Sequence, residues 1–175
     1  MKRLAIVIAL YGVFAAPAMA DEGGRRQVVK TEPLTGYHET PAVSSTGFGE
    51  FVAEIDDEAE TIAYTLSYAS LEGDAAQAHI HLGQRSVAGG VSAFLCGGGD
   101  KPPCPLRAGT VTGVIDAADV IGPTAQGIAP GEIMELIKAI RTGTAYVNVH
   151  TSKHGGGEIR GQIADQNQRE TRETR

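Results

Sequence analysis

Histidine is the residue type with the clearest potential for chemistry in this chain of 175 residues. His79 and His81 are separated by one residue, and His150 lies in a second stretch of alternating residues, 144–151. Successive side chains of a strand point to opposite faces, so His79 and His81 should leave one face about 7 Å apart. Flexible side chains can converge on one ion over that distance. The pattern therefore predicts a metal site with imidazole ligands.

Two further histidines are candidate ligands because they lie in predicted loops or turns. His154 follows in a glycine-rich turn, and His38 lies in a predicted loop. We expect His79, His81 and His150 to be the main ligands, with His154 and His38 as additional ones. The alternative is a set of incidental surface histidines, since a His-x-His pair on a strand is usually exposed. Three residues could hold the imidazole N–H groups from outside, namely Asn148, Gln77 and Glu158.

The ligand type narrows the choice of metal. Imidazole suits copper, zinc, nickel and iron. Only Met134 remains once the first twenty residues are removed, which excludes a methionine-rich cuprous site. Pairing of the two cysteines would exclude a blue-copper site. An all-histidine site in an oxidising compartment best fits Cu(II), which heads the affinity order, with Zn(II) next.

The start of the chain is typical of an export signal. Lys2 and Arg3 precede an apolar run over residues 4–16, and Ala18-Met19-Ala20 is a small-residue cleavage pattern. We therefore predict a signal peptide over residues 1–20 and a periplasmic or secreted protein. An uncleaved anchor is the alternative. The run is short for a membrane span, and the mature chain contains no candidate span.

Charge and cysteine content limit the partners. The formal net charge is −6, which disfavours nucleic acid and anionic membranes, because both require a basic face. A metal ion and another exported protein remain as candidate partners. Cys96 and Cys104 are predicted to form a disulfide, since that is the usual state in an exported protein. A thiolate metal pair is the alternative, but the spacing is not that of a CxxC motif.

Alternating hydrophobicity predicts an all-β protein. Strands are expected over residues 28–34, 47–56, 61–68, 74–82, 87–95, 109–116, 144–151 and from 157 onward. The second and third form the clearest hairpin, and residues 131–141 form one short helix. We predict an antiparallel β-sandwich, immunoglobulin-like or Cu/Zn superoxide dismutase-like, over residues 28–165. A small barrel is the second choice, and residues 166–175 should be a disordered charged tail.

Five motifs together resemble the CHRD (chordin) domain family over residues 31–164. They are Leu34-Thr35-Gly36, Glu39-Thr40-Pro41-Ala42-Val43, Ala78-His79-Ile80-His81-Leu82-Gly83, Ala145-Tyr146-Val147-Asn148-Val149-His150-Thr151 and Gly157-Glu158-Ile159-Arg160-Gly161-Gln162. The resemblance implies an extracellular, β-rich domain; single-domain bacterial members are broadly of unknown function. The family motif carries over to His79, His81 and His150. His38 departs from it, because a small or amide residue usually stands there.

The histidine pattern is also similar to the copper half of Cu/Zn superoxide dismutases, which are β-sandwiches. The chain lacks a recognisable zinc loop and a bridging histidine. We therefore expect an exported copper-binding domain that serves in binding, buffering or delivery and is more a carrier than an enzyme. A copper-dependent redox enzyme such as a dismutase is the first alternative. An interaction or adhesion module without metal is the second.

Overall fold

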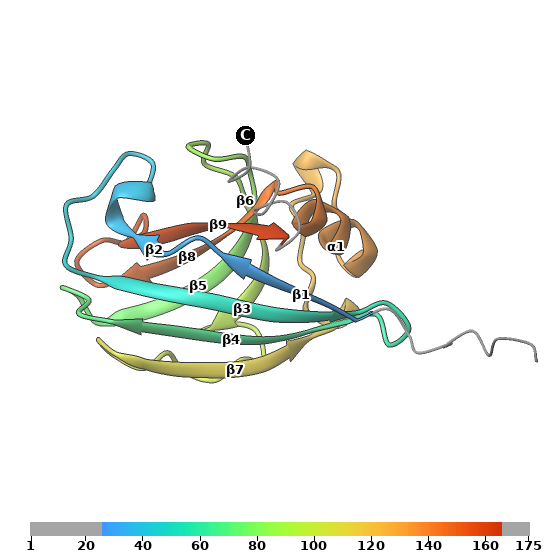
Figure 1. Ribbon diagram of the computed structural model, residues 1–175, viewed down its shortest axis with the longest axis horizontal. Helices are drawn as coiled ribbons and strands as arrows, with labels where there is room; N and C mark the ends of the chain where they lie inside the picture. Colours follow the sequence, from blue (N-terminus) through green and yellow to red (C-terminus); the bar gives the residue numbers. More distant parts are fainter. Residues whose placement is uncertain (1–25, 166–175) are drawn as a thin grey trace, which may run out of the picture.

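The structure is a computed structural model that describes residues 26–165, so the predicted signal peptide and charged tail lie outside it. Nine strands and one α-helix confirm the predicted all-β class (Figure 1). The strands are β1 (Arg26–Thr31), β2 (Leu34–Thr35), β3 (Phe48–Asp56), β4 (Thr61–Ala69), β5 (Ala75–Leu82), β6 (Gly90–Cys96), β7 (Gly109–Ile115), β8 (Ala145–Thr151) and β9 (Ile159–Asp165). Three 3₁₀ turns and helix α1 complete the described fold: η1 (Gly36–His38), η2 (Ala117–Asp119), η3 (Thr124–Gln126) and α1 (Ile133–Arg141).

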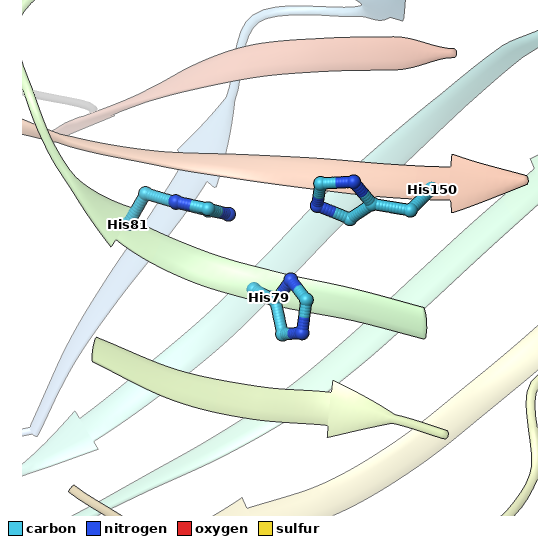
Figure 2. Close-up of side chains that lie close together, drawn as sticks. All are labelled: His79, His81 and His150. Carbon is cyan, nitrogen blue, oxygen red and sulfur yellow. The ribbon is translucent and has the colours of Figure 1, made fainter. Parts of the chain in front are cut away.

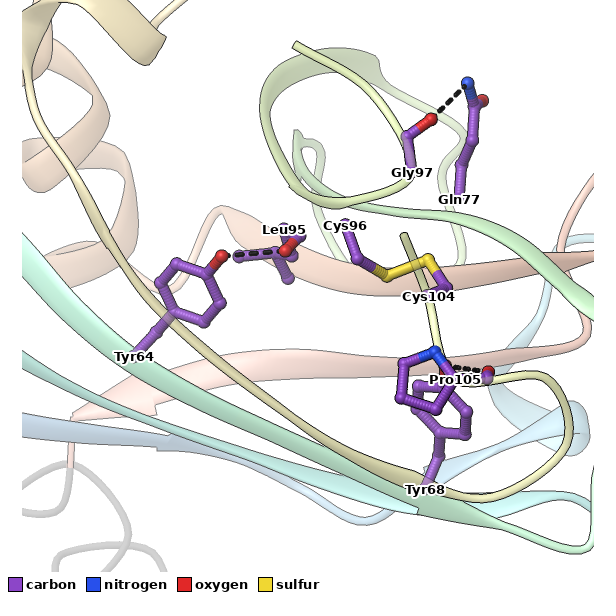
Figure 3. The surroundings of a disulfide bond; sticks show 8 residues. All are labelled: Tyr64, Tyr68, Gln77, Leu95, Cys96, Gly97, Cys104 and Pro105. Carbon is purple, nitrogen blue, oxygen red and sulfur yellow. Dashed lines mark hydrogen bonds between the residues drawn. A yellow bond between two sulfur atoms is a disulfide. The ribbon is translucent and has the colours of Figure 1, made fainter. Parts of the chain in front are cut away.

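The strands form one continuous antiparallel sheet that curls around a single core. Its order is β6-β5-β8-β9-β1-β3-β4-β7, with β2 pairing beside β3 and β9. The end strands β6 and β7 contact each other but share no ladder. The Tyr64 hydroxyl on β4 donates to the Leu95 carbonyl on β6 across 2.7 Å (Figure 3). The result is sandwich-like, because the two halves of one sheet face each other across the core.

The β3–β4 hairpin was correctly predicted, and its local chemistry explains why. Phe51, Ala53 and Ile55 are buried at alternate positions of β3, as a strand with one core-facing side requires. The turn is stabilised by Asp56, whose Oδ1 accepts hydrogen bonds from the backbone N–H groups of Glu58 and Ala59. The hairpin lies between β1 and β7 in the half of the sheet that faces the histidine-bearing strands β5 and β8 (Figure 1).

Helix α1 packs beside β8 and β9, and it begins at Ile133, two residues later than predicted. Ile133, Leu136, Ile137 and Ile140 are buried along one side, at the spacing of a helix face. Gly143 follows the helix with φ 70°, a backbone conformation in which glycine avoids steric strain. The helix thereby closes one end of the core, next to the start of β8.

The first predicted strand, residues 28–34, is divided in the structure. β1 ends at Thr31 and β2 begins at Leu34, with Glu32 and Pro33 between them. Proline has no N–H group to donate to a ladder, so the strand is interrupted there. Beyond the break, β2 pairs with the same two neighbours as β1, namely β3 and β9, and leads directly into the turn η1 that ends at His38.

The predicted disulfide between Cys96 and Cys104 is present (Figure 3). It fixes the loop that follows β6, and that loop is also held by Gln77, whose Nε2 donates to the Gly97 carbonyl across 3.4 Å. Tyr68 donates its hydroxyl to the Pro105 carbonyl just beyond the disulfide. Within residues 26–165, no helix is both long enough and apolar enough to span a bilayer.

Candidate metal centre

The sheet register brings polar residues of three strands together on the face turned away from the core. His79 of β5 pairs with Asn148 of β8, and His81 pairs with Tyr146. Asn148 in turn pairs with Arg160 of β9. Directly paired residues of an antiparallel ladder share a face. The alternation seen in the sequence thus assigned His79, His81 and Asn148 to one side correctly.

That face is buried, which the sequence did not indicate. Only 5% of His79 and 7% of His81 is exposed, and β8 has no exposed residue. Two loops cover the face: Gly89 of the β5–β6 connection donates its N–H to the Tyr146 hydroxyl, and Glu39 after η1 accepts a hydrogen bond from the Asn148 amide. The alternative of exposed surface histidines is therefore wrong for His79 and His81, because strand alternation carries no information about the loops that cover a face.

The three strand histidines form a compact cluster (Figure 2). Each offers a ring nitrogen, and the nitrogens of His79, His81 and His150 all lie within 4.8 Å of one another. The ring centroid of His79 lies 5.4 Å from that of His81 and 4.9 Å from that of His150. Within residues 26–165, no other group of histidine, cysteine or acidic residues gathers in this way. The predicted convergence of these three residues is therefore present.

Backbone hydrogen bonds orient two of the rings. The Nδ1 atom of His81 lies 3.0 Å from the Gly89 carbonyl, and that of His150 lies 3.0 Å from the Gly155 carbonyl. A carbonyl only accepts, so each Nδ1 carries the proton and each Nε2 keeps a lone pair. These two Nε2 atoms and both ring nitrogens of His79 are buried without a hydrogen-bond partner. Buried polar atoms seldom stay unpaired, and metal-bound imidazoles typically donate their other nitrogen to a carbonyl.

The electrostatics keep the imidazoles neutral. Burial lowers the pKa of His79 to about 3, and the neighbouring His150 and His81 add to the effect. Burial likewise lowers the pKa of His81 to about 4, although its hydrogen bond to Gly89 opposes the shift. The pKa of His150 is also lowered, mainly by burial. Neutral imidazole is the form that binds a metal, so protons do not compete for these nitrogens at neutral pH.

The cluster is slightly wider than a metal complex. Nitrogens bound to one ion at about 2.0–2.1 Å lie no more than about 4 Å apart, and the present limit is 4.8 Å. A contraction of about 1 Å would close the site. His79 is suited to this movement, since neither of its ring nitrogens has a hydrogen bond to break. The donor set therefore fits a copper- or zinc-sized ion after a small side-chain adjustment.

Aromatic rings and one guanidinium surround the cluster. Phe94 packs edge-on against His79, with ring centroids 4.6 Å apart. Tyr146 stacks on His81. The Arg160 guanidinium lies over the same Tyr146 ring, with its Cζ atom 3.4 Å from the ring centroid. Arg160 is 3% exposed. The arrangement is a buried cation–π contact next to a possible metal ligand.

The structure does not bring His38 and His154 into the cluster. The Nδ1 atom of His38 lies 3.1 Å from the Pro33 carbonyl. The Nε2 atom of His154 lies 3.8 Å from a carboxylate oxygen of Glu72. Their participation as ligands stays a prediction.

The three residues expected to support the imidazoles have other partners. Asn148 donates to Glu39 and to the Ile159 carbonyl, and Gln77 donates to Gly97. Glu158 is fully buried and accepts four hydrogen bonds, from the Ser45 and Thr151 hydroxyls and the Glu72 and Gly73 N–H groups. The backbone carbonyls of Gly89 and Gly155 orient the rings of His81 and His150 instead. Every residue has a carbonyl, so a sequence does not show which ones take this role.

Sequence reasoning missed four residues beside the site: Tyr146, Phe94, Arg160 and Glu39. Strand alternation does place Tyr146 on the face of Asn148 and His150, but its contact with His81 was not foreseen. Arg160 likewise occupies an outward position of its strand. Glu39 lies in a loop and accepts a hydrogen bond from Asn148. Burial raises the pKa of its carboxyl group to about 7, against the hydrogen bond from Asn148 and the charge of Arg160.

Comparison with known proteins gives a family but no characterised relative. The sequence model of the CHRD domain matches residues 31–163. No curated protein and no solved structure matches the chain. The match includes every strand that contributes to the histidine cluster and spans most of the sequence. The chain therefore belongs to the CHRD domain family, a family of extracellular-type β domains.

Proposed function

We propose that this protein is an exported metal-binding domain that holds one copper ion through His79, His81 and His150, with zinc as the second choice. It would serve to bind, buffer or deliver the ion. The observation that carries the proposal is the set of buried, unpartnered ring nitrogens on three converging histidines. Leaving such acceptors unpaired costs about 1–3 kcal/mol each, and a bound ion would remove that cost.

Copper is preferred for two reasons. It heads the affinity order of divalent first-row ions at nitrogen sites. The cluster also contains no carboxylate and no thiolate among the described residues, and both cysteines that could compete are in the disulfide. Hard ions such as Mg²⁺ and Ca²⁺ prefer oxygen ligands and are not expected to bind.

The proposal is tested by metal titration of the protein lacking residues 1–20. We expect one equivalent of copper to bind with a dissociation constant below micromolar, measured by competition with a chromophoric chelator. The His79→Ala/His81→Ala variant should bind at least about 100-fold more weakly, since second-sphere changes alone cost 10–100-fold. Equal binding by this variant, or no copper or zinc binding tighter than micromolar, would show that the site is wrong.

The matched control is His38→Ala/His154→Ala, which also removes two imidazoles. These residues lie outside the cluster, so we expect copper affinity to be retained. A loss equal to that of the cluster variant would instead identify His38 and His154 as ligands. A superoxide assay on the copper-loaded protein then separates a carrier from a dismutase, with free copper at equal concentration as the reference.

Export is part of the proposal. The disulfide between Cys96 and Cys104 favours an oxidising compartment, and the matched family is of extracellular type. Fractionation of the expressing cells with mass spectrometry of the recovered chain provides the test. We expect a periplasmic or secreted product that begins near Asp21. Full-length protein in the cytoplasm would contradict this part.

A further inference from the structure

The histidine cluster differs from an exposed all-histidine site in its charge and its burial. Three neutral imidazoles supply no negative charge, and no carboxylate belongs to the cluster among the described residues. The cost of placing an ion in a poorly solvated site rises with the square of its charge. A doubly charged ion therefore loses much more solvation there than a singly charged one.

The positive charge of Arg160 further disfavours a doubly charged ion relative to a singly charged one. Its guanidinium lies over one face of Tyr146, and His81 stacks on that same ring. The two spacings place the Arg160 Cζ atom no more than about 8 Å from the His81 ring centroid. The guanidinium is itself buried and is held by the Gln84 and Val87 carbonyls. A fixed positive charge so close repels each unit of charge on a bound ion.

The number of available ligands also favours a singly charged ion. Three histidine nitrogens converge, and His38 and His154, the remaining histidines, are placed beside Pro33 and Glu72. Cu(I) is satisfied by three ligands in a trigonal arrangement, whereas Cu(II) prefers four or five. Zinc is almost always four-coordinate. Phe94 and Tyr146 pack against the rings of His79 and His81, so aromatic surface borders the cluster beside these two ligands.

We infer that the cluster selects Cu(I) over Cu(II) and Zn(II), with Arg160 as a residue that raises the reduction potential of the bound copper through space. This inference rests on the proposed copper site. One unit charge about 10 Å away, at an effective dielectric constant of about 20, alters the ratio of Cu(I) to Cu(II) affinity by roughly tenfold. For a one-electron couple this is about 59 mV.

The main experiment measures both oxidation states on the wild-type protein lacking residues 1–20. Cu(I) affinity is measured anaerobically with ascorbate and a chromophoric Cu(I) chelator, Cu(II) affinity by competition with nitrilotriacetate, and the potential by voltammetry. We expect tighter binding of Cu(I) and a potential above that of aqueous copper. Tighter binding of Cu(II), or a potential below the aqueous couple, would overturn the inference while leaving a copper site. Failure to bind copper in either state would overturn the proposed function as well.

Variants then test the role of Arg160. Arg160→Gln should lower the reduction potential by about 59 mV, which corresponds to the tenfold change in affinity ratio. Arg160→Lys should keep a potential close to that of the wild type, because the positive charge remains. Arg26→Gln, an exposed arginine of β1 paired with Glu54, is the control and should leave the potential unchanged. Equal potentials in Arg160→Gln and the wild type would refute the role of Arg160. If Arg160→Gln does not fold, the wild-type affinities for Cu(I) and Cu(II) still test the selectivity. The potential of Arg160→Lys then tests whether the charge at this position is what matters.

Discussion

The imidazole of His81 and the phenol ring of Tyr146 lie parallel, with 8° between their planes and 4.8 Å between their centroids. The two residues face each other across the β5–β8 ladder. One side of the His81 ring is therefore fixed by Tyr146, and its edge is fixed by the Gly89 carbonyl. A ligand held in two directions loses little freedom when it binds an ion.

We expect Tyr146→Leu to weaken copper binding by up to about tenfold, because His81 would lose its stacking partner, which is worth about 0.5–1.5 kcal/mol beyond area burial. Tyr146→Phe is the matched variant. It keeps the ring and loses the hydroxyl, which accepts from the Gly89 N–H and donates to the Gly89 carbonyl, so its affinity should stay within about threefold while stability falls by about 1 kcal/mol. Chelator competition and denaturant unfolding measure the two effects. Equal losses of affinity in both variants would rule out stacking as the cause.

Gly89 and Gly155 provide a contrasting pair, since each presents a carbonyl to a histidine Nδ1. A Cβ atom at Gly89 would overlap the Leu82 carbonyl, whereas a Cβ atom at Gly155 would meet nothing within 4 Å. We expect Gly89→Ala to displace the loop, with a loss of about 1–3 kcal/mol in stability and weaker copper binding. Gly155→Ala should retain both properties. Similar unfolding midpoints for the two variants would contradict this account.

Stability of the metal-free protein should fall on acidification. Burial lowers the pKa of His79 to about 3 and that of His81 to about 4 in the folded protein, against 6.5 for an unperturbed histidine. Between these values the unfolded chain binds more protons, so the free energy of unfolding decreases as the pH drops from 6.5 toward 4. The contribution of His79 is on the order of 3 kcal/mol by pH 4. Above pH 6.5 this contribution is fully present and constant.

Glu39 acts in the opposite direction, because its folded pKa is raised from 4.5 to about 7. Its contribution to stability is present below pH 4.5 and is lost as the pH rises through 7. The measurement is therefore best made by urea unfolding in a Glu39→Gln background. His79→Gln/His81→Gln in the same background should give a flatter profile. Parallel profiles with and without the two histidines would exclude them as the source of the pH dependence.

Glu158 is expected to stabilise the fold without affecting the metal. Its carboxylate accepts four hydrogen bonds, which outweigh burial and lower its pKa. Glu158→Gln replaces one acceptor oxygen by a donor group facing other donors, so we expect a loss of about 2–3 kcal/mol. Copper affinity of the folded fraction should be unchanged. Glu50→Gln on the exposed side of β3 is the control and should change stability by less than about 0.5 kcal/mol. Weaker copper binding in Glu158→Gln would restore Glu158 as a support of the imidazoles.

Prediction from sequence succeeded where the cause is local. The alternation in residues 47–56 and 61–68 and the acidic turn between them determine the β3–β4 hairpin, and Cys96 and Cys104 are close enough in the chain to pair. It also placed His79 and His81 on one face, because strand geometry sets which side chains of a strand point the same way. Their meeting with His150 depends in addition on the pairing of β5 with β8. It did not recognise the break at Pro33, although proline is the residue type that produces such a break.

The surroundings of the site could not be predicted in the same way. Burial of the histidine face depends on loops that reach it from other parts of the fold, among them the one that supplies Gly89. The lone pairs available for a metal depend on carbonyls, which every residue possesses. The neighbourhood of Arg160 depends on the pairing of β8 with β9. Each of these is a tertiary relationship, and only the three-dimensional structure reveals it.

Strand β8 has consequences for how this sequence can diverge. Its inward side chains, such as Val147, fill the core, while its outward ones, such as His150, build the cluster. A slip of one residue in its pairing would exchange the two sets. Substitutions on either side of β8 are therefore constrained. A homologue that has lost the histidines must still fill the covered space on the outward side of the strand. We expect homologues without the histidines to carry apolar or aromatic replacements there, rather than the varied polar residues of an ordinary surface strand.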